Sequence, residues 1–187
     1  MWKAARDKGG MANLATFNPT RENAEREAEQ LIESEWAGRG LPIDPVYIAR
    51  RLGAEVYEMA LQDEVDAMLK YFEDGAAPSI FVRSDSAPVR QRFSVAHEVG
   101  HLILNQRVDP SGASIKSDIF YRNPDSKTAK KPEEVFANQF GAALLMPRKF
   151  VRTLVKDGKS DLVLANDFKV SLQAMTHRLK NLGLTTL

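Results

Sequence analysis

Three residues within one apolar segment could bind a metal ion and use it. His97, Glu98 and His101 lie in "RFSVAHEVGHLILNQ", which runs from Arg92 to Gln106 and holds two of the three histidines of the 187-residue chain. On a helix, histidines four residues apart share one face, with Cβ atoms roughly 5–6 Å apart, so both imidazoles can bind one ion. Glu98 is rotated by about 100° from His97 and can reach a metal-bound water. This is the H-E-x-x-H pattern of two zinc ligands and a general base.

A catalytic zinc ion needs a third protein ligand and an open fourth position for water. His177 is the only other histidine, and no H-x-x-G-x-x-H extension follows His101. The third ligand is therefore expected to be a carboxylate. Glu134 is the best candidate, because it comes early in a second apolar helix. Three other acidic residues remain as alternatives: Glu133, Asp118 and Asp125.

Other side chains could support the ligands and the reaction. Asn138 follows Glu134 by one turn, and its amide could accept a hydrogen bond from the outer nitrogen of a ligating imidazole. Zinc lowers the pKa of its water towards about 7 and polarises a carbonyl, while Glu98 takes the proton and passes it to the leaving amine. Candidates for stabilising the oxyanion are Tyr121 and Arg122. The pattern predicts metal-assisted hydrolysis, and the ion could be zinc, manganese or another divalent metal.

The competing interpretation is that both histidines are core residues that bind no metal. Burying three ionisable groups without partners between apolar flanks would cost several kcal/mol, and a bound ion offsets that cost. Gly100 also favours the metal site. A glycine in the middle of a helix costs about 1 kcal/mol relative to alanine, so its presence predicts a close packing contact.

Composition narrows the class of protein. The chain is 43% hydrophobic and 27% charged, which is typical of a globular protein with a substantial core. The absence of cysteine excludes disulfides, thiol nucleophiles and cysteine-based zinc sites, and fits a reducing compartment. The first twenty residues lack the apolar core of a signal peptide, and no apolar run approaches the roughly 18 residues that cross a bilayer. We expect a cytoplasmic protein without a membrane partner.

Periodicity and turn residues predict the elements that position these side chains. Residues 1–19 are expected to be a disordered tail, and 20–147 the catalytic domain. Three short strands precede the H-E-x-x-H helix, and the last two form a hairpin, which predicts a small antiparallel sheet. The expected helices are 20–36, 46–52, 86–104 and 132–146, and the expected strands are 54–59, 67–72 and 79–82.

Two segments near the predicted site are expected to have separate roles, one in restricting access and one in binding the substrate. Residues 105–132 are polar, with little pattern apart from strand character at 114–121, which is typical of a lid, a binding loop or disorder. We expect this segment to act as a gate. The sheet segment 67–82 is expected to provide an exposed edge that binds an extended peptide as an added strand.

Residues 148–187 are expected to form a helical module of the helix-turn-helix type. The turn is at Val170–Ser171, with Met175 and Leu179 facing inward and His177 outward. Eight Lys and Arg against three Asp would suit DNA contact through the second helix. Dispersed cations on amphipathic helices are, however, commonly a solvated face, which favours a packing module that helps to dock a substrate.

Three segments resemble, in order, the signature blocks of the ImmA/IrrE family of metallopeptidases: "RQRFSVAHEVGHLIL", "EEVFANQFGAALLMP" and "DFKVSLQAMTHRLKNLGL". The resemblance spans Val46 to the C-terminus. It implies an α+β, zincin-like protease core, with His97, His101 and Glu134 as zinc ligands and Glu98 as the catalytic residue. It also implies a cytoplasmic endopeptidase of bacterial or phage origin that cleaves a helix-turn-helix transcriptional repressor.

The chain departs from the family pattern at two places. Gly141 stands where many members have alanine, and a long lysine-containing segment precedes Pro132. Neither departure touches a ligand. The alternative to an endopeptidase that relieves repression is a non-catalytic zinc protein with a regulatory, DNA-binding or antitoxin-like role.

Overall fold

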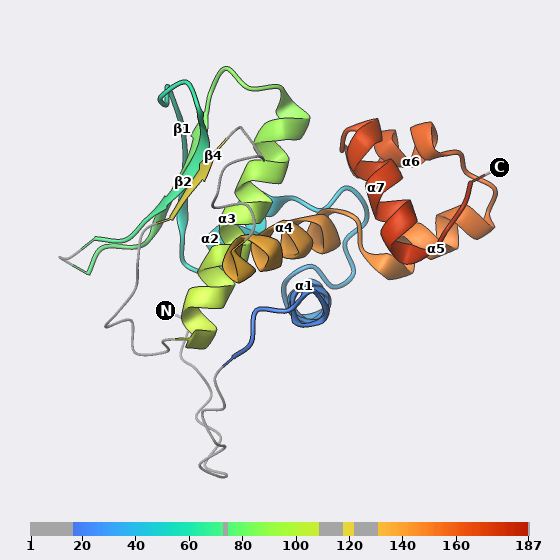
Figure 1. Cartoon of the computed structure of the whole chain (residues 1–187), viewed down its shortest axis with the longest axis horizontal. Coiled ribbons are helices and arrows are strands. Elements are labelled where there is room, and N and C mark those ends of the chain that lie inside the picture. The colour runs from blue at the N-terminus through green and yellow to red at the C-terminus, as the bar shows by residue number, and fades with distance from the viewer. Residues whose placement is uncertain (1–16, 73–74, 109–117, 122–130, 187) are drawn as a thin grey trace, which may run out of the picture.

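The protein is described by a computed structural model that covers residues 17–72, 75–108, 118–121 and 131–186 (Figure 1). Of the expected N-terminal tail, residues 1–16 lie outside this description. The helices are α1 (Arg21–Glu35), α2 (Pro45–Arg51), α3 (Pro88–Val108), α4 (Pro132–Leu145), α5 (Arg148–Lys156), α6 (Asp161–Phe168) and α7 (Leu172–Leu182). The strands are β1 (Glu55–Met59), β2 (Val65–Lys70), β3 (Ser79–Arg83) and β4 (Asp118–Tyr121).

Local capping chemistry decides where the helices begin. The carboxylate of Asp44 accepts a hydrogen bond from the backbone amide of Val46 at 2.9 Å, and Pro45 occupies the first position of α2. Pro132 likewise occupies the first position of α4, although the N-cap residue Lys131 makes no side-chain cap hydrogen bond, and two acidic residues follow in the first turn, where the helix dipole stabilises negative charge. The start of α4 therefore sets the position of Glu134 along that helix.

The sheet is mixed, which corrects the expectation of an antiparallel sheet. Its strand order is β1-β3-β2-β4. The predicted hairpin of β2 and β3 is present, and β4 pairs with β2 in antiparallel register, but β1 runs parallel to β3. Because β2 and β3 each pair on both sides, segment 67–82 is interior and cannot provide the expected peptide-binding edge. The edges of the described sheet are β1 and β4.

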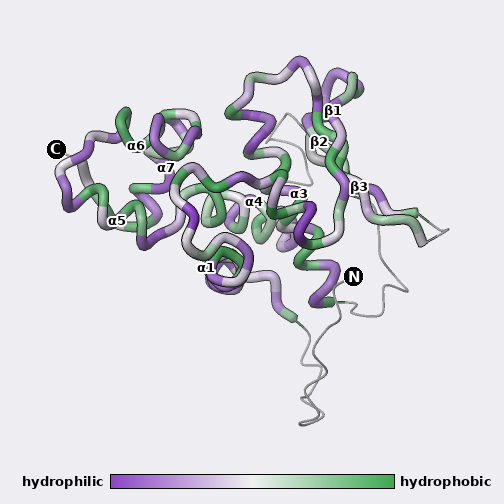
Figure 2. Tube along the Cα trace, turned by 180° about the vertical axis from the view of Figure 1, so that it is seen from behind, coloured by the Kyte–Doolittle hydropathy of each residue, from purple (hydrophilic) through white to green (hydrophobic). Residues whose placement is uncertain are grey.

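Helices α3 and α4 form the centre of the fold. Helix α3 packs against the sheet through β2 and against α4, and α1 covers α4 (Figure 1). Every residue of α3 from Ser94 to Leu104 is buried, as expected for a helix with neighbours on all sides. Figure 2 shows hydrophobic residues along α4, whereas the outer helix α1 carries both hydrophilic and hydrophobic residues. None of the described helices is long and apolar enough to span a membrane.

The C-terminal helices α5–α7 lie beside the end of α4 (Figure 1). A short turn joins α6 to α7, with Lys169 in the left-handed conformation and Ser171 capping α7. Met175 and Leu179 are buried, and His177 is exposed, as predicted from the spacing. The coarse prediction of a helical C-terminal segment is confirmed.

Two arginines, the buried Arg178 and the half-buried Arg92, tie these helices to the rest of the protein. Arg178 of α7 donates hydrogen bonds to both carboxylate oxygens of Glu25 in α1, at 2.6 and 2.8 Å, and to the carbonyl of Met146 at 2.9 Å. Arg92 of α3 donates to the carbonyl of Lys169 at 3.2 Å. Charge-assisted bonds of this kind are stronger than neutral ones, so they hold α7 in one position against the core.

Candidate metal centre

The structure brings three of the predicted site residues together. His97 and His101 lie on one face of α3, and Glu134 lies in the first turn of α4, with one ligand atom of each within 4.8 Å of the others. The two Nε2 atoms are 3.0 Å apart. The carboxylate oxygens of Glu134 lie 3.4 Å from Nε2 of His97 and 3.5 Å from Nε2 of His101.

These spacings fit a tetrahedrally coordinated divalent cation. Zinc binds histidine nitrogen and carboxylate oxygen at about 2.0–2.2 Å, which places neighbouring ligand atoms of a tetrahedron roughly 3.3–3.5 Å apart. The 3.0 Å between the two nitrogens, the 3.4 Å from His97 to Oε2 of Glu134 and the 3.5 Å from His101 to its Oε1 lie close to that value. Two imidazoles and one carboxylate are also ligands that zinc accepts. The donor set therefore fits a metal ion placed between α3 and α4.

The ionisation of two of these side chains suits metal binding. Burial lowers the pKa of His97 to about 4, so its ring is neutral at physiological pH. Burial raises the pKa of Glu134, but hydrogen bonding to His101 and His97 outweighs it and lowers the pKa to about 2. A neutral imidazole and an ionised carboxylate are the forms that bind a divalent cation.

Asn138 contacts the outer nitrogen of one imidazole. It lies one turn after Glu134 in α4, and its Oδ1 is 3.1 Å from Nδ1 of His97. In the tautomer with the proton on Nδ1, the ring donates to this amide oxygen and Nε2 would offer its lone pair to a metal ion; in the other tautomer, Nε2 donates to Glu134 instead. The structure thus places Asn138 where the spacing suggested, and its support of a metal ligand stays a prediction.

Two glycines allow the helices to approach closely. A Cβ atom on Gly100 would lie 2.9 Å from the Cα of Ala137 and 3.2 Å from Cδ1 of Phe140, which confirms the expected close contact. A Cβ atom on Gly141 would lie 3.2 Å from the backbone nitrogen of His97. Gly141, at the position where many family members have alanine, therefore lies against the backbone of His97. Both glycines bring the first turn of α4 within reach of the imidazoles.

Comparison with known proteins identifies the family. Residues 49–180 match the model of a peptidase family, M78, described as the IrrE N-terminal-like domain. The chain belongs to this family. The resemblance to ImmA/IrrE proteins is thereby confirmed, and the family indicates a metallopeptidase-type or regulatory role. No curated protein matches the chain in sequence.

A solved structure has a similar fold. The IrrE-like domain superposes on a Mycobacterium tuberculosis transcriptional regulator with a TM-score of 0.58 and 21% sequence identity. The match covers 85% of this chain and 46% of that chain, so the protein spans less than half of its structural relative. At this identity the likeness concerns the fold alone.

The other predicted site residues of the IrrE-like domain fall in different places. Glu98 directly follows His97 in α3 and is completely buried. Its role as general base stays a prediction. Glu133 is exposed on α4, outside the metal-binding cluster found among the described residues. Asp118 and Tyr121 begin and end β4, and their side chains are not described. Arg122 and Asp125 lie outside the described residues.

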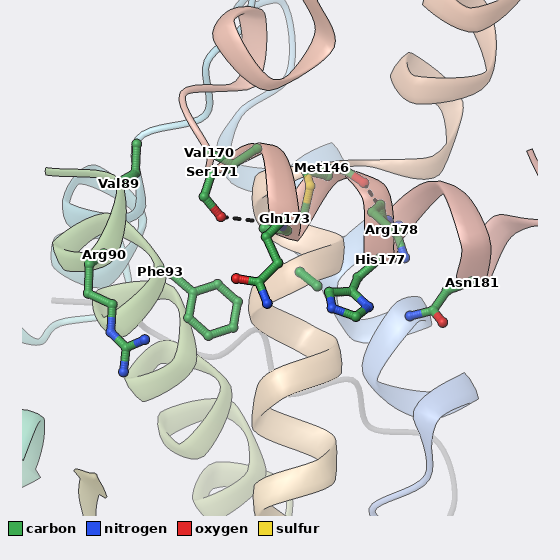
Figure 3. A pocket seen from close by; sticks show the side chains of 12 residues that line it. Val89, Arg90, Phe93, Met146, Val170, Ser171, Gln173, His177, Arg178 and Asn181 are labelled. Atoms are coloured by element: carbon green, nitrogen blue, oxygen red, sulfur yellow. Dashed lines mark hydrogen bonds between the residues drawn. The ribbon is translucent and has the colours of Figure 1, made fainter. Parts of the chain in front are cut away.

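A cavity lies beside α3 and α4, one helical turn beyond the contact between His97 and Asn138 (Figure 3). Phe93 lies one turn before His97, and Ala142 lies one turn after Asn138; both line this cavity. Sequence reasoning missed them. Phe93 could have been predicted, because it precedes His97 by four residues, the same spacing that places His97 and His101 on one face of α3.

Proposed function

We propose that this chain is a zinc-dependent endopeptidase with His97, His101 and Glu134 as the ligands of a single ion. The convergence of their ligand atoms within 4.8 Å carries the proposal. Such an ion lowers the pKa of its bound water and polarises the scissile carbonyl. The family membership of residues 49–180 supports peptidase chemistry at this position.

The side chains around the ligands have separate tasks in this proposal. Glu98, next to His97 in α3, accepts a proton from the attacking water and donates it to the leaving amine. Asn138 fixes the orientation of the His97 ring through its 3.1 Å contact with Nδ1. Burial of Glu98 and both imidazoles excludes bulk water from the reacting groups, which strengthens electrostatic interactions there.

The proposed substrate is a helix-turn-helix transcriptional repressor, and its cleavage would relieve repression. The resemblance to ImmA/IrrE proteins supports this choice, and such a substrate implies a cytoplasmic location. Proteolysis needs an extended backbone, so a flexible stretch of the repressor is the expected cleavage site. Strand β4 is an edge of the sheet and contacts α3, which favours it over segment 67–82 as the strand that an extended peptide joins.

The gate proposal concerns residues 105–132, most of which lie outside the described residues. Within this segment, α3 extends to Val108, and β4 occupies 118–121. Shortening the segment at 111–116, between α3 and β4, tests the proposal. We expect the shortened variant to cleave the repressor faster, and unchanged kinetics would refute the gate.

The experiment searches the neighbouring reading frames for a small helix-turn-helix repressor and incubates any such protein with this chain as the candidate substrate. We expect the wild-type protein to release a defined fragment, detected by intact mass spectrometry, and a chelator to stop the reaction. The Glu98→Gln variant is expected to retain zinc, measured by elemental analysis, and to release no fragment. Cleavage by Glu98→Gln would refute its assignment as the base. Stoichiometric zinc without cleavage by the wild type would favour the non-catalytic regulatory alternative.

A further inference from the structure

The sheet has an outer face, on the side away from the metal centre. Helix α3 packs against β2, β3 and β4 on the inner side, where Leu69, Ile80 and Val82 belong to the hydrophobic core. In Figures 1 and 2 the sheet lies at one side of the molecule, and the described helices lie on its inner side. The outer face is therefore a surface to which none of these helices contributes.

An apolar row crosses this outer face. Tyr57 of β1 pairs with Phe81 of β3, and Phe81 pairs with Met68 of β2; the rings of Tyr57 and Phe81 stack, with centroids 5.6 Å apart. Tyr57 is 50% exposed, Phe81 and Met68 are half-buried, and none of the three is among the described residues that form or line the core. A sheet face that meets water normally carries polar side chains, so a continuous apolar row indicates a surface that another polypeptide covers.

A charged row lies beside the apolar one. Side chains two residues apart on a strand share a face, so Glu55 lies on the same side of β1 as Tyr57. Glu55 pairs with Ser79 of β3, which pairs with Lys70 of β2. Both charged side chains are exposed, and within the described part of the chain neither takes part in an ion pair. The row thus carries a negative charge at one end and a positive charge at the other.

The two rows are complementary to themselves. A twofold axis that runs parallel to the strands and passes over Phe81 places β1 of one copy opposite β2 of the other, at the same height along the strands. Tyr57 then meets Met68 of the second copy, and the two Phe81 rings meet on the axis. In the next row, Glu55 meets Lys70 of the second copy, and the symmetry repeats this ion pair once.

We propose that the outer face of the sheet binds the same face of a second copy of this chain, with the two sheets packed about 10 Å apart. Two rows of side chains form a small contact compared with the roughly 800 Å² that each partner buries in a stable complex, so the dimer is reversible. Strand β4 lies beyond β2, where the second copy has no strand opposite it. The edge of β4 and the metal centre therefore stay accessible, and the proposal does not depend on the endopeptidase function.

Exchange of the two charges tests this arrangement. The dissociation constant of the full chain is measured by sedimentation equilibrium over the micromolar range. Glu55→Lys and Lys70→Glu each bring two like-charge pairs together, and each should weaken the dimer by about tenfold or more. The double variant recreates both pairs with their signs reversed and should restore the wild-type constant to within about threefold.

Glu58→Lys is the matched control. Glu58 is exposed on the same strand, and the substitution changes the net charge as Glu55→Lys does, but its side chain leaves the other face of β1. We expect this variant to dimerise as the wild type does. Circular dichroism verifies the fold of each variant, which substitution at exposed positions should leave unchanged.

Cross-linking of the wild-type chain tests the contact without any substitution. Protein labelled with ¹⁵N is mixed with unlabelled protein and treated with a carbodiimide, which joins a carboxylate to an amine that it contacts. Mass spectrometry should detect Glu55 of one isotopic form linked to Lys70 of the other. Links from Glu55 to Lys3 or Lys8 within a single chain would instead assign the outer face to the N-terminal segment of the same chain and overturn the proposal.

Three results of the sedimentation experiment would also overturn it. They are a wild-type chain that stays monomeric throughout the micromolar range, a dimer that both single substitutions leave intact, and a folded double variant that stays dissociated. The last result is the one expected if two copies associate through the edge of β1, because that arrangement does not bring Glu55 to Lys70.

Discussion

Replacing Gly100 by alanine tests whether close packing of α3 and α4 builds the metal centre. An added Cβ would lie 2.9 Å from the Cα of Ala137 and 3.2 Å from both its carbonyl oxygen and Cδ1 of Phe140. Carbon atoms in favourable contact are about 3.5–4.0 Å apart, so the helices must separate by roughly 0.6 Å. The nearest atom is backbone, which cannot move away as a flexible side chain can.

Two opposing effects determine the change in stability. Removing a glycine from a helix interior stabilises the helix by about 1 kcal/mol, whereas overpacking a core contact costs about 1–3 kcal/mol. We therefore expect Gly100→Ala to lower the free energy of unfolding by about 1 kcal/mol. The metal site is more sensitive, because ligand distances tolerate only about 0.2 Å. A shift of α4 carries Glu134 with it, and we expect zinc affinity to fall at least tenfold.

The assay combines urea unfolding of the metal-free protein with zinc titration against a chromophoric chelator. Gly141→Ala is the matched comparison, since it has the same gain in helix propensity but a looser contact, 3.2 Å from the backbone nitrogen of His97. We expect Gly141→Ala to change the free energy of unfolding and the zinc affinity less than Gly100→Ala does. A Gly100→Ala protein that is about 1 kcal/mol more stable and binds zinc as the wild type does would refute the reasoning.

Three further predictions follow from contacts around the centre. Asn138→Ala should weaken zinc binding by about 10–100-fold in the same titration, because the His97 ring loses its fixed orientation. Glu25→Gln leaves Arg178 buried without its counter-charge and should lower the free energy of unfolding in urea by about 3–5 kcal/mol. Burial alone would raise the pKa of Glu25, but Arg178 lowers it below 4.5. The stabilisation by this ion pair is therefore complete above about pH 4.5 and is lost as pH falls through the folded-state pKa. The difference in unfolding free energy between wild type and Glu25→Gln should become smaller over that pH range. Binding to a DNA duplex should be weak at any ionic strength, and an affinity that falls steeply with salt would contradict the packing role favoured for residues 148–187.

The parts of the protein that depend on local chemistry could be predicted from the sequence. The four-residue spacing of His97 and His101 places them on one face of a helix. The proline at the start of α4 predicts the position of Glu134, and the next turn predicts Asn138. Gly100 predicts a close contact, because its cost within a helix implies a neighbour that leaves no room for a side chain. Each of these inferences uses residues within one or two helical turns.

The features that depend on distant pairing could not be predicted. Alternation along β1, β2 and β3 indicates strands, but it does not show that β3 lies between the other two, so the sheet was expected to be antiparallel. Nothing in the sequence indicated that Arg178 is buried, because it lies in a basic, amphipathic segment where arginines are commonly exposed. Its partner Glu25 is 153 positions away, and only the folded chain brings the two charges together.

X-ray diffraction from crystals grown with zinc, measured across the zinc absorption edge, tests the central claim most directly. The account predicts one anomalous peak between α3 and α4, about 2.0–2.2 Å from Nε2 of His97, Nε2 of His101 and an oxygen of Glu134. Crystals that contain stoichiometric zinc but show no peak at this position, or show it at other residues, would contradict the claim.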